Sequence, residues 1–323
     1  MNELEKLLQR KHSHDAEKFI LSTYQRIGNP EILYSGGLEL LHHKFLFAGM
    51  KFYEHRWHMQ ELKVFKDALI RYRAKWVNTI GEITDSNLVV VGEQGIGDEL
   101  MFSSVMPQII GKPNKITWIA SPQNYEFFKH NYKHVPSLEV LNVATSLAIS
   151  ALPILNAASH VTSIGELYRM YLVETQIRLP IPKYNGTIYD VEPIPSTVAL
   201  VYKAGATNDT GPSRSFDPNA LRYVLKGKNV VSFQMPQDSS KWFKSIGGSI
   251  TSVLDTANKL ATIKTIVTCD TAMAHIGLLL KKRVALIHRE YIDWRWKNNL
   301  YPGVRLVHIG DLDRLKQFLD EEI

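Results

Sequence analysis

Cysteine and long apolar runs are nearly absent from this chain of 323 residues. The single cysteine, Cys269, excludes an internal disulfide framework and a metal site built from several cysteines. No apolar run approaches the roughly 20 residues that a membrane-spanning helix needs. The start of the chain also lacks the basic segment and apolar stretch of a secretory signal. We therefore expect a soluble, cytoplasmic protein in a reducing compartment.

Clustered metal ligands are also scarce. The carboxylates of Asp311 and Asp313 have the spacing of a metal-binding pair, but they follow the last expected strand, where aspartates commonly cap helices. The histidines at 12, 14, 42 and 43 lack further ligands nearby in the sequence. We expect neither a metal nor another cofactor.

The charge balance is modestly basic. Lysine and arginine total 38 against 32 acidic residues, a formal net charge of +6. This excess favours anionic partners such as nucleotides, nucleic acid or acidic glycans. A dedicated DNA-binding protein shows denser basic clusters, however, and solubility alone explains a charge of this size equally well.

Residues 1–80 are expected to form a small helical N-terminal unit, because apolar residues recur there at helical spacing and no convincing strand is present. The end of this unit, from about residue 51 to 76, mixes aromatic rings with basic side chains. Its later cations are Lys63, Lys66, Arg71 and Arg73. Such a mixture is typical of surfaces that stack on bases and hold phosphates, but also of aromatic helices that dock on a neighbour. Both interpretations stay open.

From residue 88 onward, short apolar runs alternate with helical or polar segments, which predicts βαβ units and an α/β fold with parallel sheets. The expected strands are 88–91, 116–120, 138–143, 198–202, 230–234, 265–269, 284–288 and 305–308. A proline-dense stretch between 180 and 195 suits a linker. We therefore expect one Rossmann-like domain at 81–185 and a second at 186–323.

The first of these strands runs into a glycine-rich turn that ends at Asp98. Gly92, Gly95 and Gly97 allow a tight turn and close approach of a ligand. Asp98 stands at the start of the next helix, where backbone N–H groups are free. The turn therefore predicts a site for a phosphate or a reacting hydroxyl. Asp98 itself is a candidate general base, or alternatively a simple helix cap.

A second strand-to-helix turn follows residues 265–269. It delivers Asp270 and Thr271 to a helix start, and the small Ala272 leaves room for a diphosphate at the free N–H groups. His275 lies about one turn further on and can reach the same ligand. An ordinary helix cap with a buried histidine is the alternative. Because open α/β sheets bind ligands at the carboxyl ends of their strands, the two turns together predict a site between the two halves.

Taken together, several segments resemble the glycosyltransferases related to ADP-heptose:lipopolysaccharide heptosyltransferases. They are spread in the same order over residues 45–308 and comprise Gly92–Asp98 with Phe102 and Pro107, Cys269–His275, Asp293–Trp296 and Tyr301-Pro302. The segment Tyr53–Trp57 also matches the Tyr-Glu-x-Arg-Trp pattern of the branch often fused to tetratricopeptide repeats.

This resemblance implies a GT-B fold, in which two Rossmann-like domains face a cleft and the C-terminal domain holds most of a nucleotide-sugar donor. Asp98 would match the proposed general base. The acceptor-side turn would consist of Glu93, Gln94, Gly95 and Gly97. The contacts to the donor phosphates and sugar would come from Asp270, Thr271, Ala272 and His275.

The loop after residues 198–202 departs from the family pattern. Asn208-Asp209 and Arg214-Ser215 remain, but the early proline and the histidine are absent. Lys203 and Arg214 have the charge to neutralise a leaving diphosphate, a task that other transferases give to a metal. We expect Lys203, Arg214 and Ser215 to contact the donor, with a surface salt bridge as the alternative role of Arg214. The loop leaves the nucleotide and the sugar open.

The leading hypothesis is a metal-independent transferase that moves a sugar from a nucleotide sugar to an acceptor hydroxyl. The resemblance suggests a surface glycan or lipopolysaccharide as acceptor, whereas the basic, aromatic segment leaves room for a hydroxylated base in bacteriophage DNA. A non-catalytic nucleotide-sugar-binding module is a second hypothesis. A dinucleotide-dependent oxidoreductase is a third, although Gly92-x-x-Gly95-x-Gly97 lacks the dinucleotide-binding spacing.

Overall fold

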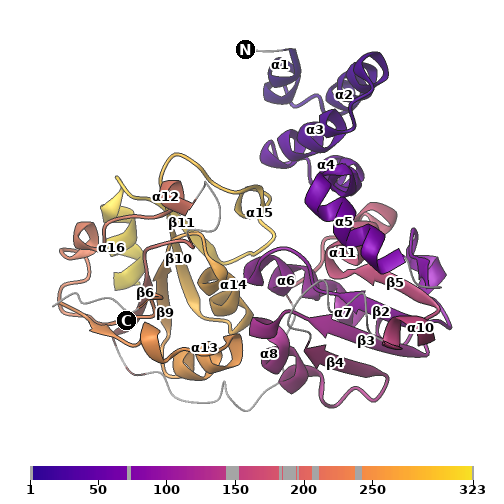
Figure 1. Cartoon of the computed structure of the whole chain (residues 1–323). Helices are drawn as coiled ribbons and strands as arrows, with labels where there is room; N and C mark the ends of the chain where they lie inside the picture. Colours follow the sequence, from indigo (N-terminus) through magenta and orange to yellow (C-terminus); the bar gives the residue numbers. More distant parts are fainter. Residues whose placement is uncertain are drawn as a thin grey trace.

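A computed structural model describes residues 3–70, 74–142, 153–181, 184, 194, 196–205, 211–236 and 242–321. These residues form two parallel sheets flanked by helices, and a column of helices stands at the N-terminal end (Figure 1). The predicted α/β fold with two Rossmann-like sheets is confirmed. No helix in the described ranges has both the length and the apolar character needed to cross a membrane.

The N-terminal column packs its successive helices against one another. Its elements are α1 (Glu3–Gln9), α2 (Ser13–Ile27), α3 (Glu31–His42), α4 (Leu46–Tyr53), the 3-10 helix η1 (Glu54–His58) and α5 (Gln60–Ile70). Two glycines bring α3 and α4 close together, since a Cβ on Gly49 would lie 2.6 Å from Leu41 Cγ and one on Gly37 would lie 2.8 Å from Phe52 Cβ. The α3–α4 pair is therefore tightly packed.

The first sheet has five parallel strands in the order β1-β5-β2-β3-β4. They are β1 (Lys75–Trp76), β2 (Asn87–Val91), β3 (Lys115–Ala120), β4 (Leu138–Asn142) and β5 (His160–Ser163). The flanking helices are η2 (Ile80–Ile83), α6 (Ile96–Phe102), η3 (Ser103–Val105), α7 (Met106–Ile109), α8 (Pro122–Tyr132), α10 (Pro153–Ala157) and α11 (Ile164–Thr175). The strands expected at 88–91, 116–120 and 138–143 are present, except that residue 143 lies outside the described ranges. Both β1, within the segment expected to be helical, and β5 were not predicted.

The second sheet has six parallel strands in the order β11-β10-β9-β6-β7-β8. They are β6 (Thr197–Val201), β7 (Asn229–Ser232), β8 (Lys244–Ser245), β9 (Thr265–Thr268), β10 (Arg283–His288) and β11 (Val304–His308). The helices are α12 (Gly211–Arg214), η5 (Pro218–Leu221), η6 (Gly247–Ser249), α13 (Val253–Leu260), α14 (Ala272–Leu279), α15 (Trp294–Lys297) and α16 (Leu312–Asp320). Asp311 caps α16 by accepting a hydrogen bond from the Arg314 backbone N–H, so the capping interpretation of this aspartate is confirmed.

Arg56 fixes the helical column to the first sheet. Its guanidinium is fully buried and bonds Glu93 at 3.0 Å and Glu166 at 2.9 Å. The rings of Tyr53 and Trp57 cover it, with centroids 4.7 and 4.4 Å from Cζ. Within 52–57, the aromatic and basic residues therefore dock one part of the chain on another, as one of the two interpretations held. Arg71 and Arg73 lie outside the described residues.

The charges of this cluster stabilise one another. Burial alone would raise the pKa of Glu166, but Arg56 and Arg169 outweigh it and lower the pKa to about 2. For Arg56, burial opposes the charge, while Glu93 and Glu166 more than offset this and raise its pKa above the ordinary value. Glu166 and Arg56 are therefore charged at neutral pH, and their charges are compensated inside the protein.

We predict that Arg56→Met costs about 3–5 kcal/mol of stability, because it leaves the buried Glu93 carboxylate without its cation. The unfolding free energy from denaturant titration measures this loss. Lys115→Met, which breaks the exposed ion pair with Glu139, is the control and should cost less than about 1 kcal/mol. Equal effects of the two substitutions would contradict the role of Arg56.

Candidate active site

The two turns identified in the sequence meet where α6 of the first domain packs on α14 of the second (Figure 1). Gly97 is a point of very close approach. A Cβ at this position would lie 2.7 Å from His275 Cδ2 and 3.5 Å from Ala272 Cα. The structure thus brings together the predicted residues Gly97, Ala272 and His275. Because Gly97 has no side chain, α14 of the second domain can pack directly against it.

Asp98 lies beside this contact and has two partners. One carboxylate oxygen accepts a hydrogen bond from the Gly95 N–H at 3.1 Å, which caps the start of α6. The other forms an ion pair with Arg295, the second residue of α15 in the C-terminal domain. The Asp98 side chain remains 24% exposed, so a ligand can still reach it. Helix capping is therefore present, and it leaves one carboxylate oxygen in a charged contact across the two domains.

Arg295 is the central cation of the site, although sequence reasoning assigned it no role beyond its place in the motif Asp293–Trp296. It contacts Asp98 and also bonds Asp293 at 2.8 Å, while its guanidinium lies 4.7 Å from the Trp294 ring centroid. Burial disfavours its charge, but Asp293 and Asp98 more than compensate and raise its pKa well above the ordinary value. Arg295 is therefore a permanent positive charge between the two domains.

Asp270 stands at the end of β9 next to α14. Its side chain accepts a hydrogen bond from Trp296 Nε1 at 3.0 Å, and its backbone carbonyl accepts one from Arg214 Nη1 at 3.1 Å. Burial, followed by the nearby Asp293, raises the pKa of the Asp270 carboxyl. The predicted donor residues Asp270 and Arg214 therefore lie together, and Trp296 joins them.

The start of α14 offers free backbone donors. Thr271 is the N-cap residue, yet its side chain makes no capping hydrogen bond, and Ala272 is the first helical residue. In a helix the first N–H groups have no partner within the helix, so they can bind an anion. The hydroxyl of Thr271 lies 3.2 Å from that of Thr268.

His275 is buried one turn into α14, with its ring against Trp296 and Tyr301. Its Nδ1 lies 2.7 Å from the Tyr301 hydroxyl. Burial, helped by Arg295, lowers the pKa of His275 to about 3, so the imidazole is neutral at physiological pH. A neutral histidine can position a ligand by hydrogen bonding, but it does not supply a positive charge.

The remaining donor-side residues come from the end of β6 and from α12. Lys203 is exposed, its ammonium lies 5.6 Å from the Tyr202 ring centroid, and its backbone N–H donates to Gln234 Oε1 at 2.8 Å. Ser215 Oγ accepts the Ala204 N–H at 3.0 Å. These residues share the carboxyl edge of the second sheet with Asp270, as predicted for a ligand-binding edge. Asn208-Asp209 lie outside the described residues.

The acceptor-side turn divides into two parts. The Glu93 carboxylate is 1% exposed and is held by Arg56 and by Ser163 Oγ at 2.6 Å. It is thus a packing group of the turn and is shielded from solvent. Gln94 adopts a left-handed φ of 63°. Its side-chain Nε2 lies 3.0 Å and its Oε1 3.4 Å from the Tyr53 hydroxyl, within hydrogen-bond distance. The residues of this turn with contacts to the second domain are Gly97 and Asp98.

The helical column also reaches this site, which the sequence did not indicate. Tyr34 of α3 packs on Tyr53 with ring centroids 5.9 Å apart, and Tyr53 packs in turn on Trp294 of the second domain with centroids 6.1 Å apart. Farther along the same face, Asn298 Nδ2 donates to the Leu41 carbonyl at 2.6 Å. The column therefore contacts both domains beside the candidate site.

Metal ligands do not gather here. Within the described ranges, no group of three or more histidine, cysteine, aspartate or glutamate side chains has an arrangement suited to a metal ion. The positive charges at this site come instead from Arg295, Arg214 and Lys203. Independence from metal remains a prediction.

We predict that Gly97→Ala destabilises the contact between the two domains by about 1–3 kcal/mol, since the new methyl group overlaps the buried His275 ring. Thermal unfolding followed by calorimetry measures the change. The control is Gly81→Ala, whose Cβ would have its nearest neighbour 4.0 Å away, at Thr79 Oγ1. If Gly97→Ala has a melting temperature as high as that of the control, the close contact is ruled out.

Comparison with known proteins identifies the fold of the chain. No protein-family model and no curated protein matches the chain. Among solved structures, ADP-heptose LPS heptosyltransferase II of E. coli is 14% identical, with a TM-score of 0.51 over 73% of this chain and 98% of that one. The iron-containing dodecameric glycosyltransferase TibC of enterotoxigenic E. coli H10407 is 11% identical, with a TM-score of 0.50 over 69% of this chain and 63% of TibC. The chain therefore has the GT-B-like fold of these glycosyltransferases.

Proposed function

We propose that this protein is a glycosyltransferase that moves a sugar from a nucleotide sugar to an acceptor hydroxyl. One observation carries the proposal: Asp98 of the first domain stands beside the open N-terminus of α14 and the cation Arg295 of the second. A base thus lies next to an anion-binding helix end, across the boundary of two Rossmann-like domains. The GT-B-like fold supports the same assignment.

In the proposed reaction, Asp98 accepts the proton of the acceptor hydroxyl. The hydroxyl oxygen forms a bond to the anomeric carbon of the donor sugar, while the bond from that carbon to the nucleoside diphosphate breaks. The diphosphate leaves with the bonding electron pair. For this to occur, the acceptor hydroxyl takes the place of Arg295 at one oxygen of Asp98, and the guanidinium turns to the departing phosphate.

The leaving diphosphate meets three kinds of positive group in this proposal. The backbone N–H groups of Thr271 and Ala272 point from the start of α14, and the helix dipole adds to their effect. Arg214 and Arg295 supply full charges, and both lie close to Asp270. Lys203 contributes from the end of β6. His275, being neutral, orients the donor sugar. Fixed cations of this kind can replace a metal in stabilising the leaving group, so we propose metal-independent transfer.

The donor can be identified by a thermal-shift screen with ADP-, UDP- and GDP-sugars. We predict that one nucleotide sugar raises the melting temperature, since a ligand at 100 times its dissociation constant stabilises by about 2.7 kcal/mol. The response should persist in EDTA and weaken in Arg214→Met. Arg222→Met, at an exposed arginine just after η5, is the control. A response to reduced dinucleotides alone would instead favour an oxidoreductase.

We predict that Asp98→Asn lowers turnover by about 10²–10⁴-fold, because the amide cannot accept the proton of the acceptor. Donor binding in the thermal-shift assay should remain largely unchanged, which separates loss of chemistry from loss of the site. The assay measures release of the nucleoside diphosphate, which accompanies transfer, or donor hydrolysis where the acceptor is unknown. Turnover equal to that of the unmodified protein would refute the role of Asp98.

The acceptor is either a surface glycan or a hydroxylated base in DNA. Both present a hydroxyl that Asp98 can deprotonate, so the transfer centre alone does not choose between them. The choice depends on surfaces that bind the acceptor away from the reacting atoms.

A further inference from the structure

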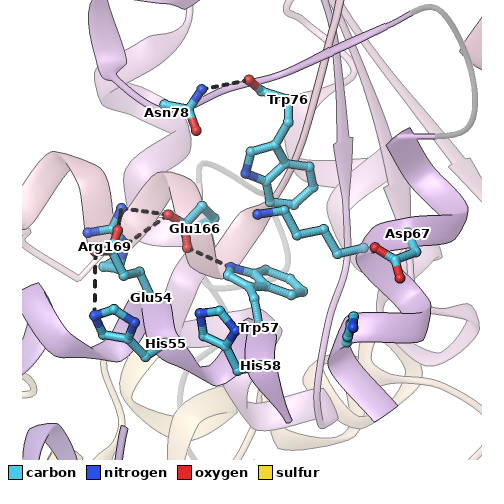
Figure 2. Close-up of a pocket in the computed structure, with 11 residues that line it drawn as sticks. Glu54, His55, Trp57, His58, Asp67, Trp76, Asn78, Glu166 and Arg169 are labelled. Carbon is cyan, nitrogen blue, oxygen red and sulfur yellow. Dashed lines mark hydrogen bonds and ion pairs between the residues drawn. The ribbon is translucent and has the colours of Figure 1, made fainter. Parts of the chain in front are cut away.

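A pocket of about 400 Å³ opens in the N-terminal half of the molecule (Figure 2). It lies between η1, α5, β1 and α11. Its lining residues are Glu54, His55, Trp57, His58, Lys63, Lys66, Asp67, Trp76, Asn78, Glu166 and Arg169. None of them belongs to the set around Asp98 and His275. The pocket is therefore separate from the proposed transfer centre. Its volume is within the range of known ligand sites.

One side of the pocket is a closed network of charges. Glu166 accepts from Arg169 Nε at 2.8 Å and from Trp57 Nε1 at 3.1 Å, and Arg56 binds it from behind. Arg169 also pairs with Glu54 at 3.2 Å. The two glutamates of this side thus have their cations already. This side gives the pocket a fixed shape, with the acidic groups engaged by the protein.

The other side carries polar groups that have no such partners. The Lys66 ammonium is half-buried and lies 4.7 Å from the Trp76 ring centroid and 5.9 Å from that of Trp57. Burial lowers the pKa of Lys66. Within the described ranges, neither Lys66 nor Asp67 makes an ion pair or a side-chain hydrogen bond, and the same holds for the Trp76 indole N–H. Donors, an acceptor and indole surface therefore face the same space (Figure 2).

This combination discriminates between possible occupants. A nucleic acid needs a surface dominated by cations, whereas the three carboxylates of this pocket balance its three cations, Lys63, Lys66 and Arg169. A sugar presents hydroxyl groups that both donate and accept hydrogen bonds, together with C–H faces that pack on aromatic rings. Asp67 can accept from such hydroxyls, Lys66 and Lys63 can donate to them, and the partly exposed Trp76 indole can cover the apolar face.

We propose that this pocket is a carbohydrate-binding site that holds one sugar unit of a glycan. The binding itself is independent of the proposed function. The further step, that the bound glycan is the acceptor, rests on the glycosyltransferase activity proposed above. The pocket is linked to the acceptor-side turn, because Arg56 bonds both Glu166 in the wall of the pocket and Glu93 of the turn.

Saturation-transfer NMR on the full chain tests the site, with methyl glycosides of glucose, galactose, N-acetylglucosamine and glucuronic acid as probes and single-stranded oligothymidylate as the nucleic-acid probe. We predict a saturable signal from at least one sugar. The apparent affinity for this sugar should fall about tenfold in Lys66→Ala. The signal should disappear in the double variant Lys66→Ala with Asp67→Ala. Alanine favours helix, so both variants should keep α5 folded.

Lys129→Ala is the matched control. Lys129 also lies over an aromatic ring, 5.1 Å from the Tyr125 centroid, but it belongs to α8 and does not line the pocket. It should bind the sugar as the unmodified protein does. The proposal is overturned if no sugar gives a saturable signal, if only the oligothymidylate binds, or if the control and the pocket variants lose the sugar equally.

The nucleotide-sugar thermal shift, measured on the same variants, separates this inference from the proposed function. The pocket variants should respond to the donor normally. Absence of a donor response in the unmodified protein would remove the proposed function and leave the sugar site standing. Retention of the donor response without sugar binding would remove the sugar site alone.

Discussion

The buried ion pairs of Arg56 are the interaction on which the arrangement of this molecule depends. A guanidinium inside a protein is tolerated only where carboxylates and ring faces surround it, and Glu93, Glu166, Tyr53 and Trp57 do so here. The same group thereby joins three regions: the helical column, the glycine-rich turn and α11. The turn that presents Asp98 is therefore held from behind by a charge that comes from another part of the chain.

Much of the fold was predictable because parallel strands covered on both faces are continuous apolar runs. Residues 88–91, 198–201 and 284–287 are of this kind, and each lies in a strand. The strands that escaped prediction lack this pattern. His160–Ser163 is mostly polar, and Lys75–Trp76 and Lys244–Ser245 are only two residues long. Such strands form because a sheet edge is already present to receive them, which is a tertiary effect.

For the site, the pairing of two strand-to-helix turns was enough to bring Gly97 next to Ala272 and His275. It was not enough to predict what Asp98 and Glu93 contact. An acidic residue in a glycine-rich turn suggests exposure, but the partner of Glu93 is 37 residues away and that of Asp98 lies in the other domain. Long-range pairs of this kind are determined by the packing of domains, and no local spacing encodes them.

The helical column has a mechanical consequence for the two domains. It is bonded to the first domain through Arg56 and to the second through the Leu41 carbonyl and Asn298. The first attachment lies in η1, directly after α4, and the second lies at the end of α3, so the tightly packed α3–α4 pair connects them. Any separation of the domains must therefore strain this pair or break one attachment. The packing of a segment outside both Rossmann-like domains thus opposes movement of one domain away from the other.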